Sequence, residues 1–384
     1  MKIVVASDSF KGTLSSKQAG EAIAAALRRA HRAARVRVVP VADGGEGTVE
    51  ALVTALRGTN RRARVCGPLG EPRTARFGLL PHRVCVIEMA ASSGLTLVPD
   101  RLRDPMRTTT RGTGGQILRA LTFRPREILI GVGGSATVDG GCGAAQALGV
   151  SFFDRAGRLI TCDLCGGNLT QIGRIDVSRS VALDAGCRLT VLCDVTNPLC
   201  GPDGAARVFG PQKFRAGRPA PKKKLAQLSA NLNHLAGVIE RDLGVDVAAL
   251  PRGGAAGGLA AGLHAYFGAE LVGGVDAVLD RIGFDRLLDN ADLVVTGEGR
   301  VDAQTARGKT AAGIAARARS RGIRCVCVAG AVGPGIDECR GLFDGVLWCT
   351  QPGDAPPKTA QSARAALTRA VTRAADDLLN QRAR

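Results

Sequence analysis

The chain has 384 residues, a net charge of +18, and apolar side chains at 45% of its positions. This length exceeds what a single hydrophobic core usually serves, so we expect two domains. The composition is typical of a globular protein. We see neither a signal peptide nor an apolar stretch long enough to span a membrane. These two observations predict a cytoplasmic protein without a membrane partner.

The positive charge would suit a nucleic-acid-binding protein, because Lys and Arg release counterions when they bind a phosphate backbone. The basic residues are instead spread over predicted helix faces, and the only dense lysine run is 222–224. We therefore expect a solvated basic surface that attracts small anionic substrates, and no nucleic-acid partner.

The twelve cysteines lie mostly within apolar runs, which predicts reduced thiols in place of a disulfide framework. The one Cys-x-x-Cys pair, Cys162 and Cys165, has no second pair with which to bind zinc. We expect neither a metal nor a redox role for it.

Strands and helices alternate in the N-terminal part of the chain. Apolar runs predict strands over 2–6, 36–41 and 61–66, with helices over 15–30 and 47–57 between them. The first two strands each lead into a loop that combines an acid with glycine, lysine or a hydroxyl. These loops contain Asp8, Ser9 and Lys11, and then Asp43, Gly44 and Gly45.

The middle of the chain has two more loops of this kind. A strand over 127–131 leads to Gly133, Gly134 and Ser135, and we expect the following helix to carry Asp139 in its first turn. A strand over 189–193 leads to a turn that contains Asp194 and Asn197, with Lys213 further on. Helices are predicted over 222–243 and from the glycine run 253–258 through Phe267.

The C-terminal part resumes the alternation of the first part. Strands are predicted over 292–296, 323–329 and 344–349, with helices over 308–321 and 359–380, and Glu298 and Arg300 follow the first of these strands. The simplest assembly is one discontinuous α/β domain, 1–66 plus 291–384, interrupted by a second α/β domain, 67–290. Ligands would bind in the cleft between them, because parallel sheets bind ligands at the carboxyl ends of their strands.

The repeated loops predict a phosphoryl-transfer site. Glycines let the backbone approach an anion, and the N–H groups at a helix start favour negative charge. Carboxylates beside such loops suit Mg²⁺, which prefers oxygen ligands together with substrate phosphates.

Two other functions stay open at this point. Gly131–Ala136 fits the G-x-G-x-x-A variant of a dinucleotide-binding loop, which would suit an NAD(P)-dependent hydroxy-acid oxidoreductase. That enzyme needs only one such loop, whereas five loops here carry acids or hydroxyls. A basic nucleic-acid-binding protein is the second alternative. Taken singly, each acid would equally serve as a helix cap or a turn residue.

Several motifs in one order carry a family resemblance: Ala6–Gly12, Pro40–Thr48, Glu88–Leu95, Gly131–Gly141, Cys193–Lys213 and Thr296–Lys309. Together they closely resemble the bacterial type 1 glycerate kinases, from Met1 to about residue 350. The resemblance implies ATP- and Mg²⁺-dependent phosphorylation of D-glycerate, to 2-phosphoglycerate, by a two-domain α/β enzyme whose flavodoxin-like first domain is interrupted by the second. The 2- or 3-position of the product, the adenine site and the oligomeric state, a homodimer included, stay open.

The chain departs from the family pattern at a few positions. Val138 replaces an Asn, Gly115 and Gln116 replace Glu-Leu, and Arg252 begins a variant of Gly-Ala-Gly. These changes put substrate preference or rate in doubt, and leave the reaction class unchanged.

The expected reaction is in-line transfer of the γ-phosphoryl group of ATP, which rests on positioning and charge neutralisation. We assign Asp194 as the general base, with Asp43 second, and Asp8, Asp43 and Glu298 as magnesium ligands, directly or through water. Lys11, as a catalytic residue, and Lys213 would balance phosphate or carboxylate charge. The other expected binding residues are Ser9, Gly44, Gly45, Gly133, Gly134, Ser135, Asn197 and Arg300.

Overall fold

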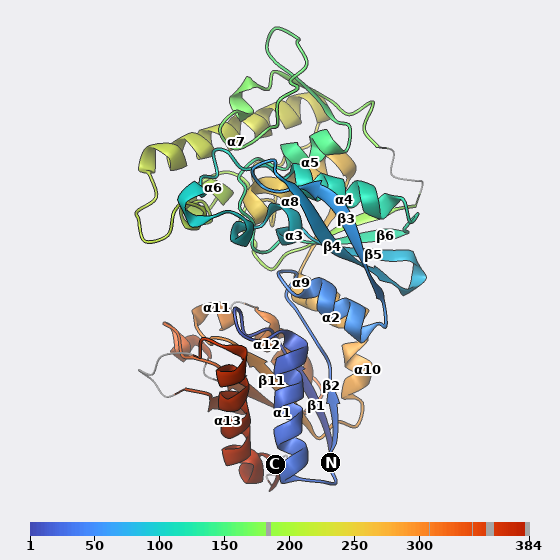
Figure 1. Cartoon of the computed structure of the whole chain (residues 1–384), viewed down its shortest axis with the longest axis vertical. Helices are drawn as coiled ribbons and strands as arrows, with labels where there is room; N and C mark the ends of the chain where they lie inside the picture. Colours follow the sequence, from blue (N-terminus) through green and yellow to red (C-terminus); the bar gives the residue numbers. More distant parts are fainter. Residues whose placement is uncertain (182–185, 307, 340, 351–356, 381–384) are drawn as a thin grey trace. The chain divides into compact units, whose positions relative to one another are not determined.

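The structure is a computed structural model that describes residues 1–181, 186–306, 308–339, 341–350 and 357–380. It is a mixed α/β protein that divides into two compact units (Figure 1). Unit 1 comprises Met1–Asp43, Glu50–Leu56 and Val275–Arg384, and unit 2 comprises Gly44–Val49 and Arg57–Gly274.

Unit 1 is built on a five-stranded sheet in which every pair of neighbours is parallel. The strand order is β13-β12-β11-β1-β2, which is 2-1-3-4-5 when the strands are counted along the unit. This is the flavodoxin-like order, as the family resemblance implied. The strands are β1 (Lys2–Ser7), β2 (Arg35–Val38), β11 (Leu293–Glu298), β12 (Arg324–Ala329) and β13 (Gly345–Trp348).

Helices cover both faces of this sheet, because alternate residues of a strand point to opposite sides. Ile3 and Val5 of β1 pack with α1 and α13, which lie side by side in Figure 1. Val4 and Ala6 pack with α9, α10 and α12. The helices in these segments are α1 (Ser16–Ala30), α2 (Thr48–Ala55), α9 (Gly274–Arg281), α10 (Phe284–Leu288), α11 (Ala303–Ala306), α12 (Thr310–Arg319) and α13 (Ala360–Asn380).

Unit 2 is built on a six-stranded sheet of order β10-β9-β6-β5-β4-β3. The first four strands are mutually parallel, whereas β4 and β3 add antiparallel pairs at one edge. A separate pair, β7 and β8, is antiparallel. The strands are β3 (Thr59–Cys66), β4 (Pro72–Leu80), β5 (Val84–Glu88), β6 (Glu127–Gly131), β7 (Ser151–Phe153), β8 (Arg174–Asp176), β9 (Arg188–Leu192) and β10 (Glu270–Val272).

Helix α8 joins the two hydrophobic cores of unit 2. Its Leu259 and Leu263 pack with the sheet and α4, while its Ala261 and Tyr266 pack with α5 and α7. A helix that is apolar on all sides is suited to this buried position. The helices of this unit are α3 (Ala90–Ser93), α4 (Arg111–Leu121), α5 (Cys142–Ala147), α6 (Ala205–Val208), α7 (Lys222–Leu243) and α8 (Ala255–Phe267).

Three details differ from the sequence prediction. The predicted strand 61–66 forms, but it pairs with β4 and so belongs to the sheet of unit 2. Asp139 does not lie in the first turn of a helix, because Gly140 and Gly141 adopt positive φ angles of 61° and 76° and α5 begins only at Cys142. The predicted domain limits at 66/67 and 290/291 differ from the division into units, and the domain assignment stays a prediction.

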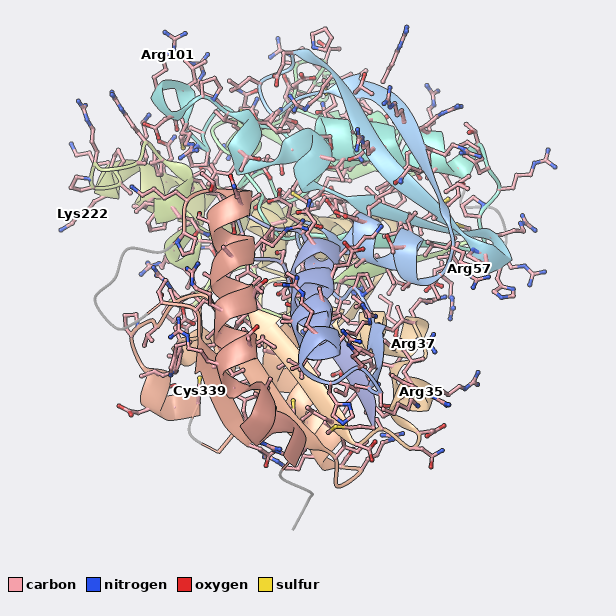
Figure 2. The ribbon with its side chains drawn as sticks, turned by 60° about the horizontal axis from the view of Figure 1, so that its bottom comes forward. Arg35, Arg37, Arg57, Arg101, Lys222 and Cys339 are labelled. Atoms are coloured by element: carbon pink, nitrogen blue, oxygen red, sulfur yellow. The ribbon has the colours of Figure 1, made fainter. Side chains whose placement is uncertain are left out.

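The surface is basic, as the composition indicated. Figure 2 shows the side chains of Arg35, Arg37, Arg57, Arg101 and Lys222 pointing away from the ribbon, and all five are exposed. All twelve cysteines are free thiols. None of the helices in the described ranges has the length and hydropathy needed to cross a bilayer.

Two helical glycines provide a matched test of the packing. A Cβ on Gly114 of α4 would lie 2.4 Å from the carbonyl oxygen of Ala144, whereas a Cβ on Gly237 of α7 would meet nothing within 4 Å. We expect Gly114→Ala to destabilise the protein by about 2 kcal/mol, in the range for overpacking. Gly237→Ala should stabilise it by about 0.5 to 1 kcal/mol through helix propensity. Chemical denaturation measures both values, and equal effects would contradict the packing described.

Candidate active site

The carboxyl edge of the unit 1 sheet has a topological switch point between β1 and β11. From β1 the chain passes through α1 to β2 on one side, whereas from β11 it passes to β12 on the other side. Asp8 follows β1 directly, and Glu298 is the last residue of β11. Ligands of open α/β sheets bind at such a point, since the connections diverge there.

Asp8 is a buried carboxylate within hydrogen-bonding distance of two donors. The backbone N–H of Ser9 donates to its Oδ1 (2.6 Å), and the hydroxyl of Thr310 donates to its Oδ2 (2.9 Å). Burial and then the negative charge of Asp43 raise the pKa of Asp8 to about 6, while these hydrogen bonds and the Lys11 ammonium oppose the rise. The predicted residues Asp8, Ser9, Lys11 and Asp43 therefore lie close together.

Glu298 is the second buried carboxylate at this edge. It accepts a hydrogen bond from the Thr305 hydroxyl. Burial raises the pKa of Glu298 to about 7, with smaller contributions from Asp8 and Asp302, while Thr305 and Lys309 oppose the rise. Lys309 in turn lies 3.6 Å from Asp302. The three acids predicted as metal ligands are thus brought together in unit 1, whereas Arg300, two residues further on, is exposed.

These acids suit a magnesium ion that is also bound by substrate phosphates. Within the described ranges, no group of three or more His, Cys, Asp and Glu side chains is arranged to enclose a metal. Asp8 and Glu298 nevertheless have raised pKa values, to which neighbouring carboxylates contribute, and a cation would relieve that repulsion. Mg²⁺ commonly binds through one or two carboxylates plus substrate phosphates, so the site suits an ion that arrives with a nucleotide.

Glycine loops from distant parts of the sequence pack together at the carboxyl edge of the unit 2 sheet. A Cβ on Gly44 would lie 2.7 Å from the Leu192 carbonyl oxygen, and one on Gly133 would lie 2.6 Å from Gly45 Cα. The backbone N–H groups of Gly47 and Val49 donate to Oε1 of Glu88, at 3.0 and 2.7 Å. Glu88 fixes this arrangement, and it is not among the residues predicted for the site.

Lys213 is a buried lysine beneath the loop that follows β6. Its Nζ donates to the Ser135 hydroxyl and to the Thr137 carbonyl, both at 2.7 Å. Burial lowers the pKa of Lys213 to about 7, although the Asp139 carboxylate favours its charged form. The predicted residues Ser135 and Lys213 are therefore in direct contact.

Asp139 is the anionic partner of this buried group. It accepts hydrogen bonds from the backbone N–H and hydroxyl of Thr110, and from the N–H groups of Gly141 and Gly143. Burial nevertheless raises the pKa of Asp139. Both carboxylate oxygens of Asp139 accept hydrogen bonds from groups of unit 2. We therefore infer that Asp139 positions the loop of Ser135 and does not contact a ligand.

Asp194 and Asn197 lie in the loop after β9. Asp194 is half-buried, and the adjacent Cys193 carbonyl accepts a hydrogen bond from Arg252 (2.6 Å). The Asn197 amide donates to the Asp203 carbonyl (2.9 Å), so it supports its own loop. Asp194 thus belongs to unit 2, and the other three predicted acids belong to unit 1.

Comparison with known proteins agrees with this arrangement of motifs. The profile of the Glycerate kinase family matches residues 3–379. The chain belongs to the glycerate kinase family. It is 45% identical over 336 residues to a glycerate kinase of Halalkalibacterium halodurans, with 87% of each chain covered. It is 46% identical over 316 residues to the glycerate 2-kinase of Escherichia coli K12, covering 82% of this chain and 81% of that one.

A solved structure supports the same grouping. A crystal structure of a protein assigned as glycerate kinase 2 from Salmonella typhimurium LT2 has a TM-score of 0.85 and 40% identity, with 98% of each chain covered. The two proteins therefore share their fold over nearly the whole of both chains.

Two departures from the family pattern are packing residues. Val138 is fully buried in a hydrophobic core of unit 2. Gln116 is buried on α4, where it accepts a hydrogen bond from the Ser92 hydroxyl (2.7 Å) and donates to the Arg76 carbonyl (3.2 Å). Both side chains are buried within unit 2, so we expect them to affect ligands only through the placement of the loops.

The raised pKa of Glu298 predicts a pH dependence of stability. Between its ordinary value of 4.5 and about 7, the folded protein retains a proton that the unfolded chain has released. Stability from this group is therefore complete below about pH 4.5 and is lost as the pH rises through 7. We expect Glu298→Gln to reduce this loss by on the order of 2 to 3 kcal/mol. Denaturant unfolding at several pH values measures it.

The control for this experiment is Glu21→Gln, which changes an exposed acid on α1 of the same unit. Its curve of unfolding free energy against pH should match that of the unchanged protein. A Glu298→Gln curve that also matches would contradict the burial of an ionisable group at this position.

Proposed function

We propose that the protein catalyses the ATP-dependent phosphorylation of D-glycerate to 2-phosphoglycerate and ADP. The observation that carries the proposal is the gathering of Asp8, Asp43 and Glu298 at the switch point of a flavodoxin-like sheet. Membership of the glycerate kinase family supports the reaction, and a relative named glycerate 2-kinase supports the position.

In this proposal, unit 1 binds the charged end of the nucleotide. Asp8, Asp43 and Glu298 would hold Mg²⁺, which would neutralise negative charge on the phosphates. Ser9 and Thr310 hold the Asp8 carboxylate in place through hydrogen bonds. Lys11, exposed beside Asp8, is placed to balance phosphate charge. Such fixed charges favour phosphoryl transfer, since they are in position before the reaction begins.

Unit 2 would bind the acceptor. The loops of Gly44, Gly45, Gly133 and Gly134 lie near strand ends, and Gly134 is exposed. Backbone N–H groups of such loops would suit the glycerate carboxylate. Lys213 holds the Ser135 hydroxyl through a hydrogen bond and adds positive charge when it is protonated. We propose that this loop orients glycerate, and that Lys213 acts on it mainly through Ser135.

The transfer itself needs one proton acceptor. The 2-hydroxyl oxygen of glycerate forms a bond to the γ-phosphorus, and the bond from that phosphorus to the β–γ bridging oxygen breaks, leaving ADP. We propose that Asp194 accepts the hydroxyl proton, with Asp43 as the second candidate. We likewise propose that residues of both units take part. Asp8, Asp43 and Glu298 belong to unit 1, whereas Asp194 belongs to unit 2.

Product analysis tests the reaction. The purified protein with ATP, Mg²⁺ and D-glycerate should release ADP in a coupled assay, and NMR should identify 2-phosphoglycerate. Formation of 3-phosphoglycerate would overturn the position alone. If ADP release does not depend on glycerate, while a hydroxy acid changes NAD(P)H absorbance, an oxidoreductase would replace the kinase. Salt-dependent duplex binding without ADP release would favour a nucleic-acid-binding protein.

Replacement of Asp194 tests the general base. Asp194→Asn should lower kcat by a factor of about 10² or more, because general-base catalysis contributes roughly 10² to 10⁴. The control is Asp203→Asn, which changes an exposed acid in the same loop and should leave kcat unchanged. Near-normal kcat in Asp194→Asn would move the role to Asp43.

A further inference from the structure

A pocket opens at the carboxyl edge of the unit 1 sheet, next to the clustered acids. It contains about 390 Å³ of empty space, with the solvent at its mouth included. The ends of four strands contribute to its walls, through Phe10 after β1, Gly299 after β11, Gly330 after β12 and Cys349 after β13.

The walls of the pocket are predominantly apolar. Phe10, Ala363 and Leu367 are buried hydrocarbon side chains, and Ala363 and Leu367 come from α13. Burial raises the pKa of the Cys349 thiol to about 12, so this group is neutral at physiological pH. Among the lining residues that the structure describes, Lys11 provides the only charged side chain, and it is exposed. Such a lining suits a flat, uncharged ring and disfavours a small polyhydroxy acid.

Two glycines let the strand ends approach one another here. A Cβ on Gly330 would lie 2.5 Å from the Gly299 carbonyl oxygen, and one on Gly299 would lie 3.3 Å from Phe10 Cα. Three loops therefore meet with main chain at the pocket wall. Main-chain N–H and C=O groups can pair with the edge of a heteroaromatic base, while the apolar side chains contact its faces.

The pocket adjoins the proposed phosphate site along two chain segments. Phe10 and Lys11 follow Asp8 by two and three residues, and Gly299 is bonded directly to Glu298. Lys11 acts on the Asp8 carboxylate and also lines the pocket. A ligand with phosphates beside Asp8 and Glu298 would thus have its uncharged end at this opening.

We propose that this pocket binds the adenine base of ATP, which makes unit 1 the nucleotide-binding unit. The proposal rests on the proposed kinase function for its choice of ligand. Its geometric basis, an apolar pocket beside clustered carboxylates, is independent of glycerate.

The experiment fills the pocket and compares a ligand that has a base with one that has none. Ala363→Leu adds three carbons to the pocket wall. We expect the Kd for ATP to rise at least about tenfold, which corresponds to 1.4 kcal/mol. The Kd for inorganic tripolyphosphate should not change, because it carries no base. The control is Ala370→Leu, since Ala370 is buried on the same helix and does not line the pocket.

The outcomes separate this proposal from the proposed function. Equal effects of Ala363→Leu on ATP and on tripolyphosphate, or no effect on either, would overturn the adenine pocket and leave the kinase function standing. Selective loss of ATP binding, in a protein that shows no glycerate-dependent ADP release, would support the pocket and overturn the function. If the variant does not fold, photolabelling of the unchanged protein with 8-azido-ATP decides. Label on the peptide of Phe10 or Leu367 supports the pocket, and label confined to unit 2 overturns it.

Discussion

Burial of carboxylates at one sheet edge, with repulsion between them as a smaller contribution, is the constraint on which the proposed chemistry depends. Asp8 and Glu298 are buried, and with Asp43 they bring negative charge together where solvent screens it poorly. Hydrogen bonds from Ser9, Thr305 and Thr310 offset part of that cost. Such a cluster is suited to bind a cation together with phosphates, because the cation would offset the electrostatic cost of the buried carboxylates.

Unit 2 meets a different constraint, since its edge is crowded with main chain. Gly44, Gly133 and Gly45 pass so close to one another and to β9 that side chains would collide. Lys213 and Asp139 lie beneath this layer, where each is buried and hydrogen-bonded. A buried ammonium with a pKa lowered to about 7 costs stability, so its retention is consistent with control of the Ser135 loop.

The sequence predicted the acids of the candidate site but missed the residues that support them. Asp8, Asp43 and Glu298 were predicted together because each follows or ends an apolar strand. In unit 1, Asp43 raises the pKa of Asp8 and Asp8 raises that of Glu298, whereas their roles as metal ligands stay predictions. Thr305 and Thr310 were missed, since a hydroxyl near a helix start usually indicates a cap. Glu88 was missed as well, because its hydrogen bonds reach Gly47 and Val49, 41 and 39 residues earlier.

By itself, the sequence determined the local elements and the family. The predicted strand 127–131 and helix 222–243 coincide with β6 and α7, because hydrophobic periodicity and bounding glycines act over short distances. Only the tertiary structure decided that 61–66 pairs with β4, that Asp139 lies in a glycine turn ahead of α5, and that Lys213 is buried under Ser135. Each of these depends on which distant segments come into contact, and that choice is made by packing of the whole unit and by burial of charge, which no local pattern records.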